Sequence, residues 1–360
     1  MIIFTSICNN YLPKAIVLAN SVKKYFPSAK FIAVIVEKSL PIGFDPSPFD
    51  NVVFAKDLGF EDFNKFIFRH AIVEASTSVK GQSFRYFLKE YPNENTFIYF
   101  DPDIVLYSEP IELIDALRTH PVVLTPHLTI PEKKDSFNKT IQAIEDNELC
   151  ALQHGVYNLG FLAITRTEDS VKFIDWWAER LSLFCYDDIP RGIFTDQRWI
   201  DLAPCFFDVF ILKHPGYNTA PWNVSMRDIT KEAGEYLVNG LPLRFFHYSG
   251  FDSGANLGML DRYVPEHSNS VFEIRNNYIK DQDSAGQEKL TKEPWSYGIY
   301  DDGKIIETKT RRVLRKTFLD YRTIPINPFV SEKETMKFAP TYSRLRKGLS
   351  KIKKVILNRK

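Results

Sequence analysis

Two carboxylates one residue apart could form a cation site in this chain. Asp101 and Asp103 are separated by Pro102 and directly follow the apolar run of residues 97–100. This run has the composition of a buried strand, and ligands of open α/β sheets bind beyond the carboxyl ends of strands. Carboxylate oxygens at such a place suit Mg²⁺ or Mn²⁺. The alternative is a solvated turn at Pro102, and the triplet alone does not decide between the two.

A histidine at the end of another apolar run offers a third ligand. His247 follows two phenylalanines, and Gly250 comes three residues later, where a glycine would let a phosphate approach the backbone. Imidazole is an acceptable ligand for Mn²⁺ beside carboxylates. A lone histidine of this kind is more often a hydrogen-bonded structural residue, so His247 is a candidate ligand with a structural alternative.

Two further short motifs with polar residues lie next to predicted secondary-structure elements. Asp196 and Gln197 follow Thr195, which is a plausible cap of a helix, and an acidic residue there also favours the helix dipole. Asn158 lies two residues before Gly160 and just ahead of an apolar run, where an ordinary turn is the alternative. Each motif is ambiguous by itself.

The elements that would position these residues alternate between strands and helices. Residues 2–7 predict a buried strand, residues 15–26 a helix and residues 31–36 a second strand, and this spacing predicts a βαβ unit with parallel strands. Further predicted elements are a largely helical stretch at 65–91, strands at 97–100, 104–107, 121–125 and 161–164, a helix capped by Ser108 with Pro110 in its first turn, a surface excursion or rim helix at 130–147, and helices at 171–184 and from Thr195. The sequence therefore predicts an α/β fold.

The pattern weakens near Arg262, which predicts one domain at 1–262 and a C-terminal extension at 263–360. Within the extension, residues 281–293 are expected to be the least structured. The tail 342–360 is basic, has no acidic residue and carries an apolar helical stripe. It is either a solvated terminus or an amphipathic helix that lies on an anionic membrane surface.

The composition excludes some classes of function. With 46 basic and 45 acidic residues, the chain has no overall charge that would attract nucleic acid. The four cysteines are scattered without metal-ligand spacing, which suits a reducing compartment. No basic leader precedes the first apolar stretch, and no apolar run is long enough to cross a bilayer. We therefore expect a cytoplasmic protein.

The order of the motifs resembles the GT-A glycosyltransferases. A βαβ unit is followed by Asp-x-Asp, Asn-x-Gly, Asp-Gln and His-x-x-Gly, as in the retaining glycosyltransferase family 8 of glycogenin and the bacterial lipopolysaccharide galactosyltransferases. The resemblance covers about residues 1–260 as separated motifs. It implies a Rossmann-like, mixed and mostly parallel sheet flanked by helices, with a mainly helical or irregular C-terminal extension.

The resemblance also implies roles for individual residues. Asp101, Asp103 and His247 would bind Mn²⁺ or Mg²⁺ across the diphosphate of a nucleotide-sugar, and Asp101 would also touch the ribose. The nucleoside, with Tyr11 stacked on a base such as uracil, and the rest of the donor would contact Thr5, Ile7, Asn10, Tyr11, Arg85 and Gly250. The sugar and the reaction face would be lined by Asn158, Asp196 and Gln197.

One position departs from the family pattern. The family motif continues to a lysine that neutralises the leaving diphosphate, and Ser253 occupies that position here. Either another cation such as Arg262 substitutes, or the site is built differently.

The implied activity is metal-dependent transfer of a hexose-type sugar from a nucleotide donor, with a UDP-sugar favoured. The acceptor would be a glycan or a lipid-linked glycan in bacterial surface polysaccharide synthesis. Retention by a front-face route is favoured, whereas Asp196 would be the nucleophile of a double displacement or the general base of an inverting enzyme. Two alternatives are a catalytically silent GT-A module and a sugar nucleotidyltransferase. The second normally has a Gly-rich, basic loop after its first strand, where this chain has residues 8–11.

Overall fold

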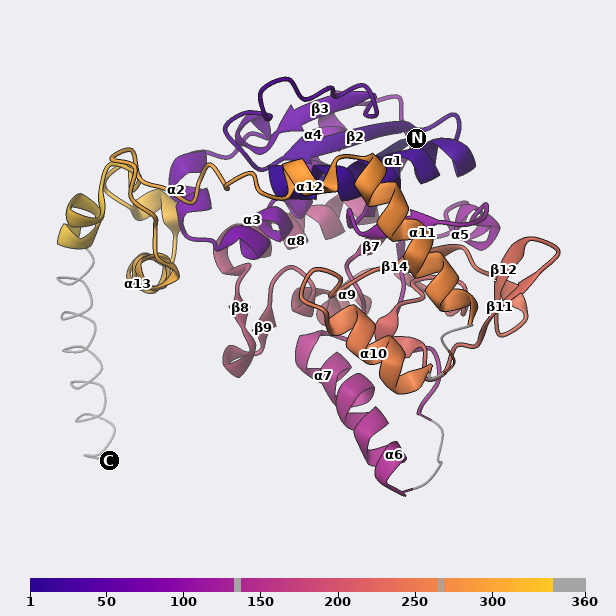
Figure 1. Cartoon of the computed structure of the whole chain (residues 1–360). Coiled ribbons are helices and arrows are strands. Elements are labelled where there is room, and N and C mark those ends of the chain that lie inside the picture. Colours follow the sequence, from indigo (N-terminus) through magenta and orange to yellow (C-terminus); the bar gives the residue numbers. More distant parts are fainter. Residues whose placement is uncertain (133–136, 265, 267–268, 339–360) are drawn as a thin grey trace, which may run out of the picture.

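A seven-stranded sheet forms the centre of the molecule (Figure 1). The computed structural model describes residues 1–132, 137–264, 266 and 269–338, so the predictions for the basic tail lie outside the described residues. The strand order is β10-β6-β7-β4-β1-β2-β3. In chain order the strands are β1 (Ile2–Ile7), β2 (Lys30–Ile35), β3 (Asn51–Phe54), β4 (Thr96–Phe100), β6 (Val122–Leu124), β7 (Phe161–Thr165) and β10 (Phe210–Ile211).

Only β7 runs against its neighbours in this sheet. It pairs antiparallel with β4 and β6, whereas every other pair is parallel. The predicted mixed, mostly parallel sheet is therefore confirmed. The strand order reverses beside β1, which lies between β2 and β4. The carboxyl ends of β1 and β4 thus meet at a topological switch point, where ligands of such sheets bind.

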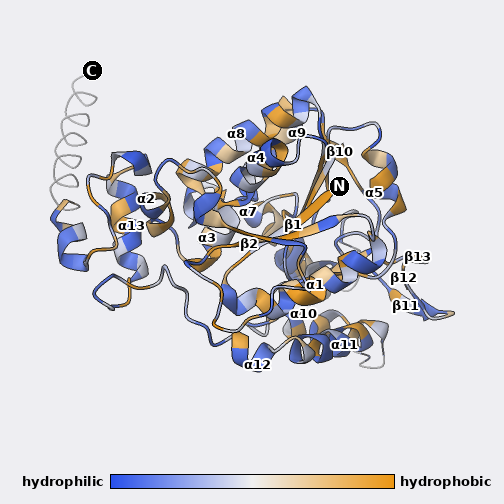
Figure 2. Cartoon of the chain, turned by 90° about the horizontal axis from the view of Figure 1, so that it is seen from above, coloured by the Kyte–Doolittle hydropathy of each residue, from blue (hydrophilic) through white to orange (hydrophobic). Residues whose placement is uncertain are grey.

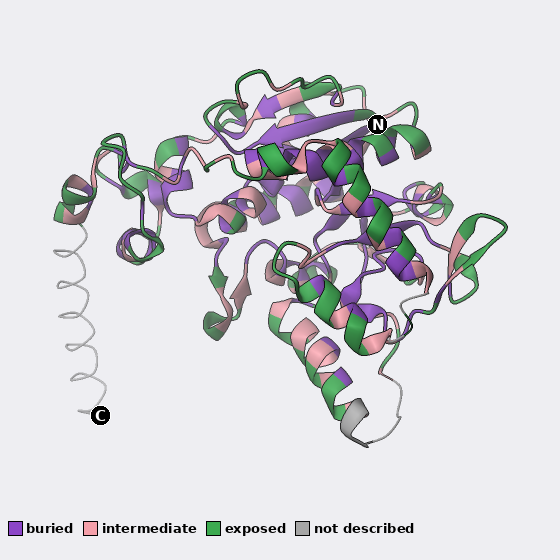
Figure 3. Ribbon diagram, in the orientation of Figure 1, coloured by how far each residue is buried: buried purple, intermediate pink, exposed green. Residues whose placement is uncertain are grey.

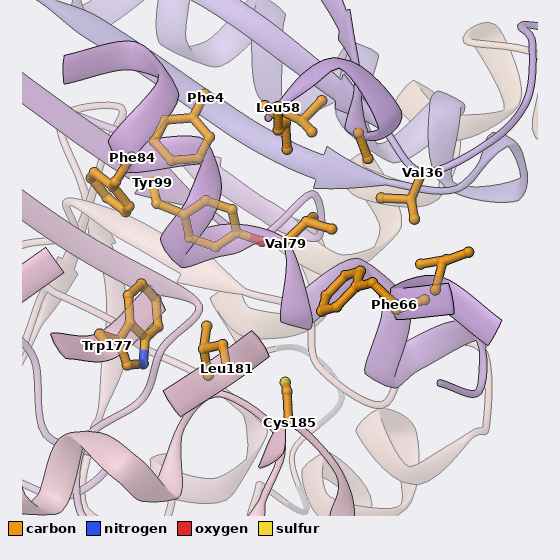
Figure 4. Close-up of a cluster of buried hydrophobic side chains, with 14 of the residues drawn as sticks. Phe4, Val36, Leu58, Phe66, Val79, Phe84, Tyr99, Trp177, Leu181 and Cys185 are labelled. Carbon is orange, nitrogen blue, oxygen red and sulfur yellow. The ribbon is translucent and has the colours of Figure 1, made fainter. Parts of the chain in front are cut away.

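Helices cover both faces of the sheet, and its central strands are buried, whereas the edge strands β3 and β10 are partly exposed (Figure 3). On one face, α1 (Leu12–Tyr25) packs its apolar side against the sheet. On the other face, α4 (Lys80–Glu90) and α8 (Glu168–Phe184) pack together. Figure 4 shows this second layer, in which Phe4 of β1 meets Phe84 of α4, and Trp177 of α8 lies below them. In Figure 2, hydrophilic and hydrophobic residues alternate along α4 and α8, as in amphipathic helices.

Smaller elements complete the edge of the sheet that carries the candidate residues. Beyond β4 the chain turns into β5 (Ile104–Leu106), which pairs antiparallel with β14 (Phe245–His247). Apart from short 3₁₀ helices, the other elements before residue 264 are α2 (Phe63–Phe68), α3 (Ile72–Ser78), α5 (Ile111–Ala116), α6 (Phe137–Ala143), a π-helical segment (Ile144–Leu149), α7 (Cys150–His154), β8 (Asp187–Asp188), β9 (Ile193–Phe194), α9 (Ala203–Phe206), β11 (Ile229–Glu232), β12 (Glu235–Val238), β13 (Leu241–Pro242) and α10 (Ala255–Tyr263).

Two predicted helix caps are wrong. Helix α5 begins at Ile111 with Pro110 as its N-cap residue, and the Ser108 hydroxyl instead donates a hydrogen bond to the Leu243 carbonyl. Thr195 does not cap a helix, because its φ of 43° places it in the left-handed region. A short 3₁₀ helix begins only at Arg198.

The extension is more ordered than the sequence indicated. Helix α11 (Ser270–Ser284) and α12 (Gln287–Leu290) span most of the stretch that we expected to be least structured. The reason is burial, since Val271, Ile274 and Tyr278 lie at helical spacing on one face, and Tyr278 stacks on Tyr248 with ring centroids 3.8 Å apart.

Helix α13 (Thr308–Thr317) returns to the core of the domain. Leu314 of α13 belongs to the same hydrophobic cluster as Phe66 and Phe68 of α2. In both Figure 1 and Figure 2, α13 lies beside α2. The described part of the extension therefore packs into the core of the preceding domain. In the described part of the chain, no helix is long and apolar enough to cross a membrane.

Candidate functional site

Strand pairing brings the three predicted metal ligands together. Asp101 and Asp103 lie in the turn between β4 and β5, and the pairing of β14 with β5 places His247 opposite Ile104. The Tyr248 amide donates a hydrogen bond to the Asp103 carbonyl over 2.8 Å, which fixes this register. One ligand atom from each of Asp101, Asp103 and His247 lies within 4.8 Å of the others. The cluster is therefore a candidate metal centre.

The surroundings of His247 orient its ring towards Asp103. Nε2 of His247 lies 3.1 Å from Asp103 Oδ1, and Nδ1 lies 3.3 Å from Asn218 Oδ1. When a cation is bound, a proton on Nδ1 that is donated to Asn218 would leave the Nε2 lone pair free to ligate it, as metal-binding histidines require. Gly160 permits this position, because a Cβ atom there would lie 2.4 Å from His247 Cε1.

Asp103 is held in its charged form. Burial alone would raise the pKa of Asp103, but His247 and Lys14 together lower it below its ordinary value. Mn²⁺ accepts a donor set of two carboxylates and one imidazole, and the two carboxylates also suit Mg²⁺. The residues present thus fit a divalent cation.

Two cavities meet at the metal cluster. One has a volume of about 350 Å³ and lies at the end of β1, where Ile7, Asn10 and Tyr11 contribute to its wall. The other has a volume of about 330 Å³ and is lined by the predicted reaction-face residues Asn158, Asp196 and Gln197. Asp101 and Asp103 line both cavities. The cluster therefore lies on the boundary between a predicted nucleoside side and a predicted sugar side.

The nucleoside side retains an unsatisfied polar group. Asn10 Oδ1 is buried, and among the described residues it has no hydrogen-bond partner. The Tyr11 ring is covered by the Lys14 ammonium group, which lies 4.1 Å from the ring centroid and 2.5 Å from Asp252. Thr5 is fully buried within β1 and lines neither of the two cavities described above.

Lys80 is a site residue that the sequence reasoning missed. Its Nζ lies 3.1 Å from Asp101 Oδ1 and 3.0 Å from Asp196 Oδ2, and it donates a hydrogen bond to the Leu159 carbonyl over 2.9 Å. Although burial would lower the pKa of Lys80, the two carboxylates and Tyr99 raise it well above its ordinary value. Lys80 is therefore a fixed cation that links Asp101 of the candidate metal centre to Asp196 in the wall of the neighbouring cavity.

The sequence contained one signal for Lys80. Positions 80, 84 and 87 share one face of α4, and Phe84 and Phe87 are buried there. A lysine on an apolar helical stripe needs a buried counter-charge, but the sequence does not identify that partner.

Asp196 lies in a constrained part of the backbone. Burial raises the pKa of Asp196 even though Lys80 lowers it. The preceding Thr195 has a positive φ, which is costly for a β-branched residue and is a form of strain that clusters at functional sites.

Asn158 and Gln197 form a hydrogen-bonded amide frame. Asn158 Nδ2 donates to Gln197 Oε1 over 3.3 Å, and Gln197 Nε2 donates to the His154 carbonyl over 3.0 Å. Asn158 Oδ1 also accepts from the Gly160 amide over 3.0 Å. This frame lines the cavity and fixes the loop before β7.

Four other residues of the prediction lie elsewhere. Arg85 is on α4 but faces α8, where its Nε lies 2.7 Å from Asp175 Oδ1, because five residues along a helix turn its side chain away from Lys80. Arg262 pairs with Asp146 on the rim. The exposed Ser253 donates to the Gly250 carbonyl, and the wall of neither cavity includes Ser253 or Gly250. The cations that the structure brings to the cluster are Lys14 and Lys80.

Two curated proteins of Bacillus subtilis (strain 168) match part of the chain. The uncharacterized protein YfnD is 25% identical over 167 residues, which is 46% of this chain and 49% of YfnD. The uncharacterized protein YfnF is 27% identical over 167 residues, which is 46% of this chain and 52% of YfnF. The chain thus spans about half the length of these relatives. No family model matches it.

Several solved glycosyltransferase structures resemble the fold. The galactosyltransferase LgtC in complex with donor and acceptor sugar analogs is 17% identical, with 82% of this chain and 98% of that chain covered and a TM-score of 0.44. A glycosyltransferase involved in glycosylation of the major capsid of PBCV-1 is 10% identical, with 72% of this chain and 98% of that chain covered and a TM-score of 0.38. At these values the likeness does not by itself assign an activity.

Proposed function

We propose that this chain is a metal-dependent glycosyltransferase that moves a hexose-type sugar from a nucleoside-diphosphate donor, with a UDP-sugar favoured, to a glycan or lipid-linked acceptor. The observation that carries the proposal is the Asp101, Asp103 and His247 cluster on the boundary between two cavities. A diphosphate is the part of such a donor that lies between its nucleoside and its sugar, so the cluster is where a diphosphate would bind.

The residues of the two cavities would bind different parts of the donor. Ile7, Asn10 and Tyr11 would hold the nucleoside, and the two aspartates with His247 would hold the cation. When bound, this cation would neutralise the charge that develops on the leaving diphosphate.

On the proposed reaction face, Lys80 would add a permanent positive charge beside Asp101, because its raised pKa keeps the ammonium group protonated. Asn158 and Gln197 would position the sugar through the side of their frame that lines the cavity. We further propose retention by a front-face route. The acceptor hydroxyl would give its proton to an oxygen of the departing phosphate, while its own oxygen bonds to the anomeric carbon. The Asp196 carboxylate is paired with Lys80, which reduces its nucleophilicity and so argues against a covalent intermediate.

Proton NMR of the new glycosidic bond tests the stereochemistry. An anomeric configuration opposite to that of the donor would remove the retaining proposal and make Asp196 the candidate base.

We place the reaction in the cytoplasm and in bacterial surface polysaccharide synthesis, with peripheral membrane contact through the tail 342–360. All four cysteines are free, which is compatible with a reducing compartment. Sedimentation with anionic liposomes, before and after removal of the tail, tests the contact, and unchanged binding would remove it.

A donor screen tests the activity. Nucleotide release and thermal stabilisation are measured with UDP-, GDP- and dTDP-sugars, with and without Mn²⁺, for the natural chain, Asp103→Asn and the exposed control Asp115→Asn. We expect one donor to give Mn²⁺-dependent release that Asp103→Asn abolishes and Asp115→Asn retains. If no donor stabilises the protein, the silent-module alternative holds, whereas Mn²⁺-dependent exchange between a nucleoside triphosphate and a sugar phosphate would indicate a nucleotidyltransferase.

A further inference from the structure

A third cavity lies where α13 packs against the core. It has a volume of about 300 Å³, and its wall includes four cationic side chains and one acidic side chain, Asp188. The four cationic residues, which we call the arginine pocket, are Arg69, Arg191, Arg315 and Lys316. They come from the end of α2, the loop between β8 and β9, and α13 (Figure 1). This cavity shares no wall residue with the two at the metal cluster.

Arg69 is the central observation, because its guanidinium is buried and only partly satisfied. Its side chain is 0% exposed, and Nη2 donates to the carbonyls of Leu183 and Leu319, each over 2.9 Å. Within the described residues, Nε and Nη1 have no hydrogen-bond partner, and no carboxylate oxygen lies within ion-pair distance of Arg69, although the Asp320 carboxylate interacts with its charge at longer range. A buried guanidinium with two unpartnered nitrogens is costly, so an anionic group beside it would be stabilising.

The neighbours of Arg69 are held rigidly around the cavity. The Tyr186 ring lies 4.0 Å from the Arg315 guanidinium and 5.5 Å from that of Arg69. Arg315 is itself paired with Glu74 over 2.9 Å, so its fork is fixed in place. The Tyr186 hydroxyl is buried, and among the described residues it too has no partner. Arg69 and Tyr186, which both belong to the cavity wall, therefore carry donors without a hydrogen-bond partner among the described residues.

We propose that the arginine pocket binds a phosphate group carried by a small molecule or a lipid headgroup. Guanidinium forks match the oxygens of phosphate. Of the four cations, Arg315 is paired with Glu74, and Arg191 lies 3.5 Å from Asp188. The cavity wall still carries an excess of positive charge, which favours a doubly charged anion over a carboxylate. A volume of about 300 Å³ exceeds that of a phosphate alone, which leaves room for the group to which the phosphate is attached. The proposal does not depend on the glycosyltransferase assignment.

Calorimetric titration of the full chain with inorganic phosphate tests the proposal. The protein is kept free of divalent metal, so that the aspartate cluster cannot recruit the anion. A second arm measures sedimentation with phosphatidylcholine vesicles, with and without phosphatidic acid. Arg69→Gln is the direct variant, but it also removes two hydrogen bonds to carbonyls and could unfold the chain.

The decisive variant is therefore Arg191→Gln with Lys316→Gln, because Lys316 is exposed and the Arg191 side chain is 52% exposed. Its matched control is Lys309→Gln with Arg312→Gln, two exposed cations on α13 outside the cavity wall. Circular dichroism confirms that both double variants fold.

We expect saturable binding of phosphate that the pocket variant weakens by about tenfold or more, as the loss of two charge-assisted contacts implies, and that the control retains. Binding to phosphatidic acid vesicles alone, with the same dependence on the variants, would assign the phosphate to a lipid headgroup. The proposal would be overturned if the natural chain bound neither inorganic phosphate nor the phosphatidic acid vesicles, or if both double variants weakened binding equally.

Discussion

Replacement of Lys80 by methionine is expected to destabilise the protein strongly, and the effect should depend on Asp196. The Lys80 side chain is 2% exposed, and its Nζ lies 3.0 Å from Asp196 Oδ2. Methionine retains most of the volume of the stem but removes the charge. The variant would therefore leave the Asp196 carboxylate, whose side chain is only 3% exposed, buried without a counter-charge.

The magnitude follows from the burial of both partners. Removal of one partner from a buried ion pair costs about 3–5 kcal/mol, which is a large part of a typical stability of about 5–15 kcal/mol. Asp101 should contribute less to this loss, because its side chain is 25% exposed and it accepts a hydrogen bond from the Tyr99 hydroxyl.

The loss should also depend on pH in a defined direction. Without Lys80, the pKa of Asp196 in the folded state rises further above its unfolded value, because burial is then less opposed. A carboxyl with a raised folded pKa destabilises the fold above that pKa, and the penalty disappears once the pH falls below the unfolded value of about 3.9. The deficit of Lys80→Met should therefore shrink as the solution is acidified.

Urea unfolding measures these effects in the natural chain, Lys80→Met, Asp196→Asn and the double variant. The control is Lys89→Met, since Lys89 is on the same helix and its side chain is 83% exposed; its stability should change by no more than about 0.5 kcal/mol. The double variant should be more stable than Lys80→Met, with a coupling energy of at least about 1 kcal/mol. Equal stability of the double variant and Lys80→Met at neutral pH would refute the assignment of Asp196 as the main partner.

Three further predictions concern the metal ligands and one distant ion pair. His247→Ala should weaken Mn²⁺ binding in a calorimetric titration, and an unchanged affinity would exclude His247 as a ligand. Gly160→Ala should push the His247 ring away and lower Mn²⁺ affinity by about 10–100-fold, whereas Gly258→Ala, whose Cβ would meet no atom within 4 Å and whose φ is not positive, should not change the affinity. Glu112→Gln should cost about 1 kcal/mol at neutral pH, because Arg244, acting against burial, lowers the pKa of the partly exposed Glu112 to about 2. In urea unfolding this cost should persist above the unfolded pKa and vanish as the pH falls towards 2; a cost independent of pH would contradict it.

Sequence patterns predicted most of the sheet and failed where burial depends on distant partners. The strand at Ile2–Ile7 and the helix α8 follow from local periodicity, and both appear where we expected them. Helix α11 was missed because its apolar residues are sparse, and the burial of Tyr278 depends on Tyr248, which lies thirty positions earlier in the chain.

In the candidate site too, the residues at strand ends could be predicted from the sequence, whereas the charged residue on a helix could not. The clustering of Asp101, Asp103 and His247 could be predicted because each stands beside the end of an apolar strand, and strand ends converge in an α/β sheet. A charge on a helix carries no comparable signal, since its direction depends on the rotation of the helix against its neighbours. Arg85 and Lys80 illustrate this, because both lie on α4, yet only Lys80 points towards the sheet. The cation that meets the site had to be found from the packing of α4, and for that reason the role of Lys80 is the part of the site that most needs the double-variant measurement.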